Sequence, residues 1–227
     1  SDFHQAVDAK LAAIEGLEFG YCAHIGEVDL RLIGPAGAIT TARAIALESF
    51  APYLISVDGA SLEATVVRLL TQQSKRVATA ESCTGGLISA ACTELAGSSQ
   101  WFERGFVTYS NDAKHESLGV DAALIARVGA VSEPVAQAMA LGALRHSKAQ
   151  VSLAVTGVAG PTGGSASRPV GTVCFAWALP SDAGPTLGAE TAWVKVQTCH
   201  FEGDRAAVRQ ATHAHALQRL IELWHQR

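Results

Sequence analysis

The 227-residue chain lacks a strong excess of charge of either sign, since 17 Lys and Arg residues and 21 Asp and Glu residues give a net charge of −4. General binders of nucleic acids or of anionic membranes depend on a basic surface, so this balance argues against both classes. No apolar run approaches the ~20 residues of a membrane span. The polar N-terminal residues show no basic and apolar stretch of the kind found in signal peptides. We therefore expect a cytoplasmic protein that binds neither nucleic acid nor membrane.

The sequence also lacks a metal-binding or disulfide pattern. Its five cysteines are an odd number and contain no Cys-x-x-Cys pair, which argues against a disulfide framework and a zinc knuckle. His213 and His215 lie two residues apart in an expected helix, so they point to different sides and cannot hold one metal together. Reduced thiols are the expectation.

The overall composition is that of a globular, enzyme-sized domain, with 48% apolar and 17% charged residues. A chain of this length buries roughly 70–75% of the surface that its unfolded form exposes. One large domain, with or without a small additional module, is therefore expected.

Residues 1–57 predict a small α+β module, because their apolar spacing indicates helices and strands in the order α-β-β-α-β. We expect its helices over 6–14 and 40–50, and its strands over 19–25, 28–33 and 53–57. The module holds three basic and seven acidic residues, which leaves 14 of each sign from the totals of 17 and 21. Asp58-Gly59 is a turn signal at its end.

Residues 58–227 predict an α/β domain, since helical and strand patterns alternate. We expect helices over 61–74, 85–95, 121–128, 133–146 and 203–224, and strands over 77–80, 101–109, 151–155, 170–179 and 192–196. Strand 151–155 has no charged residue, as in the middle of a parallel sheet, and a hairpin loop is expected over 180–189. The predicted architecture is a three-layer α/β/α sandwich with a mixed sheet covered on both faces.

Three polar segments directly follow expected strands, and the first carries a serine. This segment is Ala80-Glu81-Ser82-Cys83-Thr84-Gly85-Gly86. A serine on a strand-to-helix turn lies near backbone N–H groups that stabilise an oxyanion or bind a phosphate. The alternative is that Ser82 or Thr84 only caps the helix. Ala80 replaces the first glycine of the G-x-S-x-G elbow, and Cys83 is better explained as a packed thiol than as a nucleophile.

The second segment is Thr108-Tyr109-Ser110-Asn111-Asp112-Ala113-Lys114. The carboxyl ends of strands in an open α/β sheet share one edge where ligands bind, so Tyr109 and Lys114 are expected within reach of Ser82. A lysine beside a serine acts as its general base when burial lowers the pKa of the amine. The alternative is a solvent-exposed lysine on a short helix that follows an Asn/Asp cap.

The third segment is Thr156-Gly157-Val158-Ala159-Gly160-Pro161-Thr162-Gly163-Gly164. Its glycines allow a close approach of the backbone to a ligand and expose N–H groups as an anion-binding nest. It matches neither the dinucleotide fingerprint nor the P-loop, and a flexible surface loop is the alternative. Arg168 beyond it contacts a phosphate or is solvated, and the sequence leaves both options open.

Taken together and in this order, the segments resemble the CinA C-terminal domain family, which includes nicotinamide-nucleotide amidases. The resemblance covers about 61–227, and five separated groups of motifs carry it: Ala80-Glu81-Ser82-Cys83-Thr84-Gly85-Gly86; Tyr109-Ser110-Asn111-Asp112-Ala113-Lys114; Val131-Ser132-Glu133-Pro134-Val135-Ala136; Thr156-Gly157-Val158-Ala159-Gly160-Pro161 with Arg168-Pro169-Val170-Gly171-Thr172-Val173; and Phe201-Glu202-Gly203-Asp204-Arg205 with Arg209. Residues 1–57 resemble the KH-like module that precedes this domain in longer family members.

The resemblance implies hydrolysis of the carboxamide of nicotinamide mononucleotide to nicotinate mononucleotide and ammonia, in pyridine nucleotide salvage and without a metal or cofactor. It implies Ser82 as nucleophile, Lys114 as its base and acid, and Tyr109 as the residue that orients this pair or the ring. The implied oxyanion and substrate contacts are Glu81, Thr84, Gly85, Gly86, Asn111, Thr156, Gly157, Ala159, Gly160 and Arg168. A homodimer is also expected.

Two other functions remain open at the level of sequence. The first is a nucleic-acid-binding protein, because Gly34-Pro35-Ala36-Gly37 forms the G-x-x-G of a KH loop; that loop has no Lys or Arg and lies in an acidic module, which argues against it. The second is a non-catalytic relative that only senses a nucleotide, against which the presence of Ser82, Tyr109 and Lys114 argues.

Overall fold

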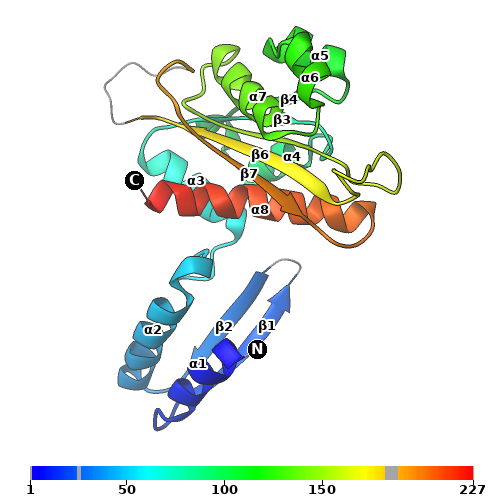
Figure 1. Ribbon diagram of the computed structural model, residues 1–227. Coiled ribbons are helices and arrows are strands. Elements are labelled where there is room, and N and C mark those ends of the chain that lie inside the picture. The colour runs from blue at the N-terminus through cyan, green and yellow to red at the C-terminus, as the bar shows by residue number, and fades with distance from the viewer. Residues whose placement is uncertain (1, 25–26, 182–188, 227) are drawn as a thin grey trace. The chain divides into compact units, whose positions relative to one another are not determined.

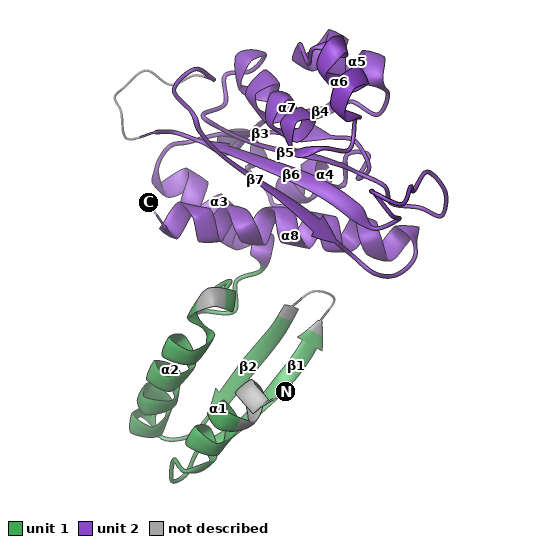
Figure 2. Cartoon of the chain, viewed as in Figure 1, with its two compact units in different colours: residues 1–61 green, residues 62–227 purple. Residues whose placement is uncertain are grey.

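The computed structural model describes residues 2–24, 27–181 and 189–226, and its contacts divide the chain into two compact units. Unit 1 spans residues 1–61 and unit 2 spans residues 62–227 (Figure 2). None of the helices in the described ranges combines the length and the apolar character that crossing a bilayer requires.

Unit 1 is a β-hairpin packed against two helices. Its elements in chain order are α1 (Asp2–Ala12), β1 (Glu18–His24), β2 (Glu27–Ile33), α2 (Ala36–Phe50) and the 3₁₀ helix η1 (Ala51–Tyr53). The two strands are antiparallel, with Phe19 opposite Leu32. Both residues pack against a small core that contains the buried side chains of Val7, Leu11 and Ala42.

The strand expected over 53–57 is wrong. Residues 51–53 form η1, and residues 54–57 pair with neither strand of the described hairpin. Tyr53 and Val57 are 66% and 51% exposed, so this apolar run is not covered within the unit. An apolar run identifies a strand only if a neighbouring strand is present to pair with it, and the sequence pattern does not reveal the neighbour.

Unit 2 contains all the helices and strands that were expected after residue 58, with ends shifted by a few residues, and α5 is the short helix that was considered as an alternative around Lys114. Its elements in chain order are α3 (Leu62–Gln72), β3 (Val77–Glu81), α4 (Leu87–Thr93), η2 (Ser98–Gln100), β4 (Phe102–Val107), α5 (Asn111–Leu118), α6 (Ala122–Val128), α7 (Glu133–Arg145), β5 (Val151–Gly157), β6 (Thr172–Leu179), β7 (Trp193–His200) and α8 (Arg205–His225). Of the expected hairpin loop over 180–189, residues 182–188 lie outside the described residues.

The five-stranded sheet of unit 2 has the order β4-β3-β5-β6-β7. Strands β4, β3 and β5 are parallel, whereas β6 is antiparallel to both β5 and β7. Helix α7 lies on one face of the sheet, and α3 and α8 lie on the other (Figure 1). The predicted three-layer sandwich with a mixed sheet is therefore confirmed.

The strand directions place four strand ends along one edge. Because β6 runs antiparallel to both of its neighbours, β7 is again parallel to β5, and Gly157 and His200 end their strands at the same side of the sheet. The segments that follow β3, β4 and β5 therefore meet the start of α8 at this edge.

The two faces of the sheet differ in side-chain size: small residues face α7, and large aromatic residues face α8. Small residues of β5 and β6, including Ala154, Ala176 and Ala178, pack against α7. On the other face, Phe175 and Trp177 are stacked with ring centroids 5.4 Å apart, and the indole N–H of Trp177 donates to the carbonyl oxygen of Ala216 in α8 at 2.9 Å. The core thus fixes the position of α8 against the sheet.

We predict that Trp177→Ala lowers the free energy of unfolding by about 3–5 kcal/mol, because it leaves a large cavity under α8 and removes the indole hydrogen bond to Ala216. Urea unfolding followed by circular dichroism measures the loss. Trp193→Ala is the matched control, since Trp193 is 39% exposed, and it should cost clearly less. Equal losses in the two variants would contradict this description of the core.

Candidate active site

The turn between β3 and α4 presents Ser82 at the shared strand edge. All five residues of β3 are buried, and the chain reverses through Gly85 and Gly86, whose φ angles are +63° and +98°. Glycine adopts these left-handed conformations without steric cost. The amide N–H of Ser82 donates to the carbonyl oxygen of Val155 at 3.0 Å, which ties the turn to β5.

Lys114 reaches this serine from α5, a short helix whose N-cap is Ser110. Its Nζ donates to Ser82 Oγ at 3.0 Å, to the carbonyl oxygen of Thr108 at 2.8 Å and to that of Tyr109 at 3.4 Å. The Lys114 side chain is 1% exposed, so the expected helix is present but the solvated lysine is not. The structure therefore brings Ser82 and Lys114 into direct contact inside the protein.

The surroundings of Lys114 favour its neutral form. Burial lowers the pKa of its amine, with a smaller opposing effect from the Cys83 thiol. Within the described part of the chain, the hydrogen bonds of Nζ go to one hydroxyl and two carbonyls, with no carboxylate among them. Without a counterion the ammonium form loses its hydration and gains little in return, so the amine is available as a base at lower pH than an ordinary lysine.

The resemblance implied Gly85 and Gly86 as oxyanion contacts, but their amides already have acceptors within the turn. The amide N–H groups of Gly85 and Gly86 already donate to Ser82 O and to Glu81 Oε2, each at 3.1 Å, so they close the turn and are not available to a ligand. Burial raises the pKa of the Cys83 thiol to about 12, with smaller opposing effects from the amides of Cys83 and Thr84. Cys83 is therefore a protonated, buried thiol. The amides of Cys83 and Thr84 are the turn's N–H groups that donate to no oxygen of the described residues.

Glu81 does not face the open side of the site. Its side chain is fully buried, and both carboxylate oxygens accept hydrogen bonds from the start of α4. The expectation that Glu81 contacts a substrate therefore fails. The contact was implied by the family resemblance, but neighbouring residues of a strand point to opposite faces, so Glu81 and Ser82 need not face the same side.

Two arginines at the start of α8 form one wall of a cavity beside this turn. Arg205 donates to the carbonyl oxygen of Gly160 at 2.9 Å and to the Tyr109 hydroxyl at 3.0 Å. Arg209 donates to the carbonyl oxygen of Thr84 at 2.7 Å. Both guanidinium groups thus join the three polar segments that follow the strands.

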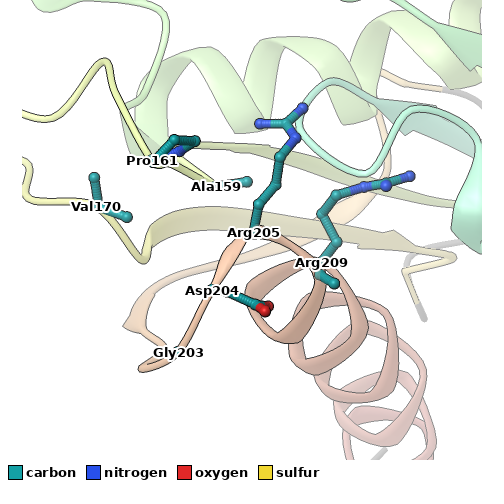
Figure 3. Close-up of a pocket in the computed structure, with 8 residues that line it drawn as sticks. Ala159, Pro161, Val170, Gly203, Asp204, Arg205 and Arg209 are labelled. Carbon is teal, nitrogen blue, oxygen red and sulfur yellow. The ribbon is translucent and has the colours of Figure 1, made fainter.

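The cavity has a volume of about 660 Å³. It is lined by Ala159, Pro161, Val170, Gly203, Asp204, Arg205, Ala206 and Arg209. Figure 3 shows the two arginine side chains extending from α8 in the same direction. Arginines four residues apart on a helix lie on one face. This spacing was visible in the sequence, but it did not show that the two residues face a cavity until the fold was known.

The remaining expected residues divide between this cavity and its surroundings. Ala159 lines the cavity, and the carbonyl oxygen of Gly160 accepts from Arg205. The Thr156 hydroxyl donates to the carbonyl oxygen of Ala130 at 3.0 Å, and Gly157 packs closely against Thr172 O and the Cys83 sulfur. These two residues hold the loop in place.

Asn111 and Arg168 lie elsewhere. Asn111 lines a separate hollow of about 270 Å³ with Asp112 and His115. The Arg168 guanidinium donates to the carbonyl oxygen of Val128 and packs against Gly129. Neither residue is among those that line the cavity with Arg205. Over residues 2–24, 27–181 and 189–226, no three His, Cys, Asp or Glu side chains are grouped as a metal ion would require.

Comparison with known proteins gives a consistent match for unit 2. Residues 59–224 match the family model of the CinA C-terminal domain. An Escherichia coli K12 protein named nicotinamide-nucleotide amidohydrolase PncC is 47% identical over 165 residues, which cover 73% of this chain and 92% of that protein. A CinA-like protein of Akkermansia muciniphila is 45% identical over 222 residues, which cover 98% of this chain and 51% of that protein. The chain thus spans about half the length of this longer relative.

Solved structures show the same fold. The competence/damage inducible protein CihA of Agrobacterium tumefaciens is 43% identical with a TM-score of 0.62, over 74% of this chain and 98% of that one. A competence-damaged protein (CinA) superfamily member of Escherichia coli is 33% identical with a TM-score of 0.66, over 77% of this chain and 98% of that one.

We predict that Lys114 titrates below the ordinary lysine value of 10.5, because burial disfavours its ammonium form. NMR of protein with ¹³C-labelled lysine Cε follows the titration, and Lys114→Gln identifies the signal. Folding then favours the neutral amine, so the stability that this group contributes rises with pH from its lowered pKa up to the ordinary value. The same signal in urea-unfolded protein is the control, and a folded-state pKa at or above 10.5 would exclude the buried-base description.

Proposed function

The chain belongs to the CinA C-terminal domain family, and on this basis we propose that it hydrolyses the carboxamide of nicotinamide mononucleotide to nicotinate mononucleotide and ammonia. The observation that carries the proposal is the 3.0 Å contact between Ser82 Oγ and the Nζ of the buried Lys114. The 47% identity to an amidohydrolase named for this substrate class supports the choice of carboxamide. The cytoplasmic location and the homodimer stay predictions from the sequence.

The hydrogen bonds of Lys114 suit a neutral base. A neutral amine keeps two N–H bonds, and the carbonyl oxygens of Thr108 and Tyr109 accept them. Its lone pair is then directed at Ser82 Oγ, and the hydrogen bond between the two side chains reverses, with the hydroxyl as donor. The two carbonyls therefore aim the base as well as hold it.

The reaction follows as two acyl transfers. Ser82 Oγ bonds to the carboxamide carbon while its proton passes to Lys114 Nζ, and the C=O electron pair moves onto the oxygen. The amides of Cys83 and Thr84 stabilise the resulting oxyanion. Collapse of this intermediate breaks the C–N bond, the Lys114 ammonium protonates the leaving nitrogen, and ammonia departs. Water, deprotonated by Lys114, then attacks the Ser82 ester and releases the carboxylate and the serine hydroxyl.

Arg205 and Arg209 recognise the phosphate of the mononucleotide. They are the guanidinium groups of the cavity wall. Arg205 also holds the Tyr109 hydroxyl, so the phosphate end of the cavity is joined to the segment that carries Lys114. A nucleotide bound in this way would extend from the arginines towards Ser82.

We expect Ser82→Ala to reduce ammonia release from nicotinamide mononucleotide by roughly 10³-fold or more, because the variant has no nucleophile. The measurement is an ammonia assay at saturating substrate, with circular dichroism to show that the fold is retained. Ser99→Ala, in the exposed helix η2, is the matched control and should keep full activity. Normal turnover by Ser82→Ala would contradict the mechanism.

Removal of a cavity arginine should affect the mononucleotide selectively. For Arg205→Ala we expect kcat/KM to fall about tenfold to hundredfold for nicotinamide mononucleotide, as for the loss of a charge-assisted contact. Nicotinamide riboside, which has no phosphate, should show little change. Arg168→Ala is the control, since Arg168 contacts Val128 instead of the cavity. The assignment of the phosphate site would be wrong if Arg168→Ala lowered the ratio of kcat/KM for the mononucleotide to kcat/KM for the riboside and Arg205→Ala did not.

A further inference from the structure

A buried carboxylate lies directly behind the nucleophile turn, where the proposed reaction has no use for it. Glu81 is the last residue of β3, and its side chain is fully buried. Its Oε2 accepts from the amides of Gly86 at 3.1 Å and Ile88 at 3.0 Å. Its Oε1 accepts from the amide and the hydroxyl of Ser89, at 2.8 and 2.6 Å. One side chain thus satisfies three backbone N–H groups at the start of α4.

These contacts replace a cap that the local sequence does not provide. The N-cap residue of α4 is Gly86, which has no side chain to accept a hydrogen bond from the first turn. Glu81 supplies the acceptors from the preceding strand. The carboxylate therefore connects the residue before Ser82 with the residues after the turn.

The turn is fixed at several further points, which leaves Ser82 little freedom. The amide of Gly85 donates to Ser82 O at 3.1 Å, and the carbonyl oxygen of Glu81 accepts from the amide of Thr108 at 2.8 Å. From outside, Arg209 holds the carbonyl oxygen of Thr84. On the buried side of the turn, the Glu81 carboxylate joins the end of β3 to the start of α4 and so holds both ends of the turn.

We infer that Glu81 is a positioning residue, which holds the Ser82 turn so that Oγ lies within hydrogen-bond distance of Lys114 Nζ and of a bound carboxamide. The inference rests on the proposed function. Displacement of a reacting group by a fraction of its contact distance lowers the rate of the chemical step more than it lowers substrate binding. Glu81 touches neither the substrate cavity nor Lys114, so it acts through the backbone of the turn.

The test compares Glu81→Gln with Ser89→Ala. Glutamine keeps the size of the side chain, but its NH₂ group faces backbone N–H donors, so it disrupts one half of the contact set. Ser89→Ala removes one of the four hydrogen bonds to Glu81, together with the 2.6 Å contact between the Ser89 and Thr79 hydroxyls, and leaves the backbone contacts of Glu81 intact. We expect Glu81→Gln to lower kcat about tenfold to hundredfold with KM changed less than about threefold, and Ser89→Ala to change both by less than about threefold.

Two further measurements separate positioning from other roles. The first is the rate at which a fluorophosphonate labels Ser82, in protein that circular dichroism shows to be folded; it should fall in Glu81→Gln along with kcat. The second is the acidic limb of the pH profile of kcat/KM, which should keep its midpoint, because Glu81 is not a charge partner of Lys114. Glu81→Asp, whose shorter side chain cannot reach both Ile88 and Ser89, provides the same test if the glutamine variant does not fold.

The outcomes decide separately on the two proposals. A folded Glu81 variant with the labelling rate and kcat of the unchanged protein would overturn the positioning role, and so would a shifted acidic limb, which would make Glu81 an electrostatic partner of the base. Loss of thermal stability alone, with kcat retained, would reduce Glu81 to a helix cap and also overturn the inference. If the unchanged protein releases no ammonia but Ser82 is labelled, the substrate proposal fails while the role of Glu81 is still tested by labelling.

Discussion

The site depends on one costly contact, the burial of a lysine amine against a serine hydroxyl, with no carboxylate of the described residues bonded to the amine. Desolvation of the Lys114 amine disfavours its ammonium form, and two backbone carbonyls and Ser82 Oγ are its hydrogen-bond partners. A lysine on the surface would be charged and solvated at neutral pH and would not act as a base. The surrounding structure therefore has to hold α5 firmly in place, through its packing on α6 and α7, since the amine gains its reactivity only from being buried.

The strand order provides the means. Three parallel strands place Ser82, Tyr109 and the glycine-rich loop at one edge, and the antiparallel β6 returns the chain so that β7 ends at that same edge. Helix α8 can then start beside the nucleophile turn and extend along the face of the sheet opposite to α7, where the indole of Trp177 bonds to it. A sheet of this topology brings the cationic start of α8 to the strand ends that carry the site. Arg205 contacts Tyr109 there although 96 residues separate the two in the chain.

Much of the fold followed from the sequence, because the period of apolar residues reflects which face of an element is buried. The elements of unit 2 were predictable for this reason, and the strand expected over 53–57 failed because pairing depends on a neighbour that the period does not encode. The pair Ser82 and Lys114 was predictable from the rule that strand ends share an edge. Arg205 and Arg209 were visible only as part of a motif, and Arg168 was the more obvious candidate by its position after the loop.

The sequence by itself determined the types and order of most elements, the acidic character of the first module and the candidates for nucleophile and base. Only the tertiary structure decided the partner of each polar group. It directed Glu81 to the start of α4 and closed the Gly85 and Gly86 amides within the turn. It also gave Arg205 and Arg168 different partners, the carbonyl oxygens of Gly160 and Val128. The physical reason is that hydrogen bonding and burial depend on the approach of segments far apart along the chain, whereas sequence patterns record only what each segment requires locally.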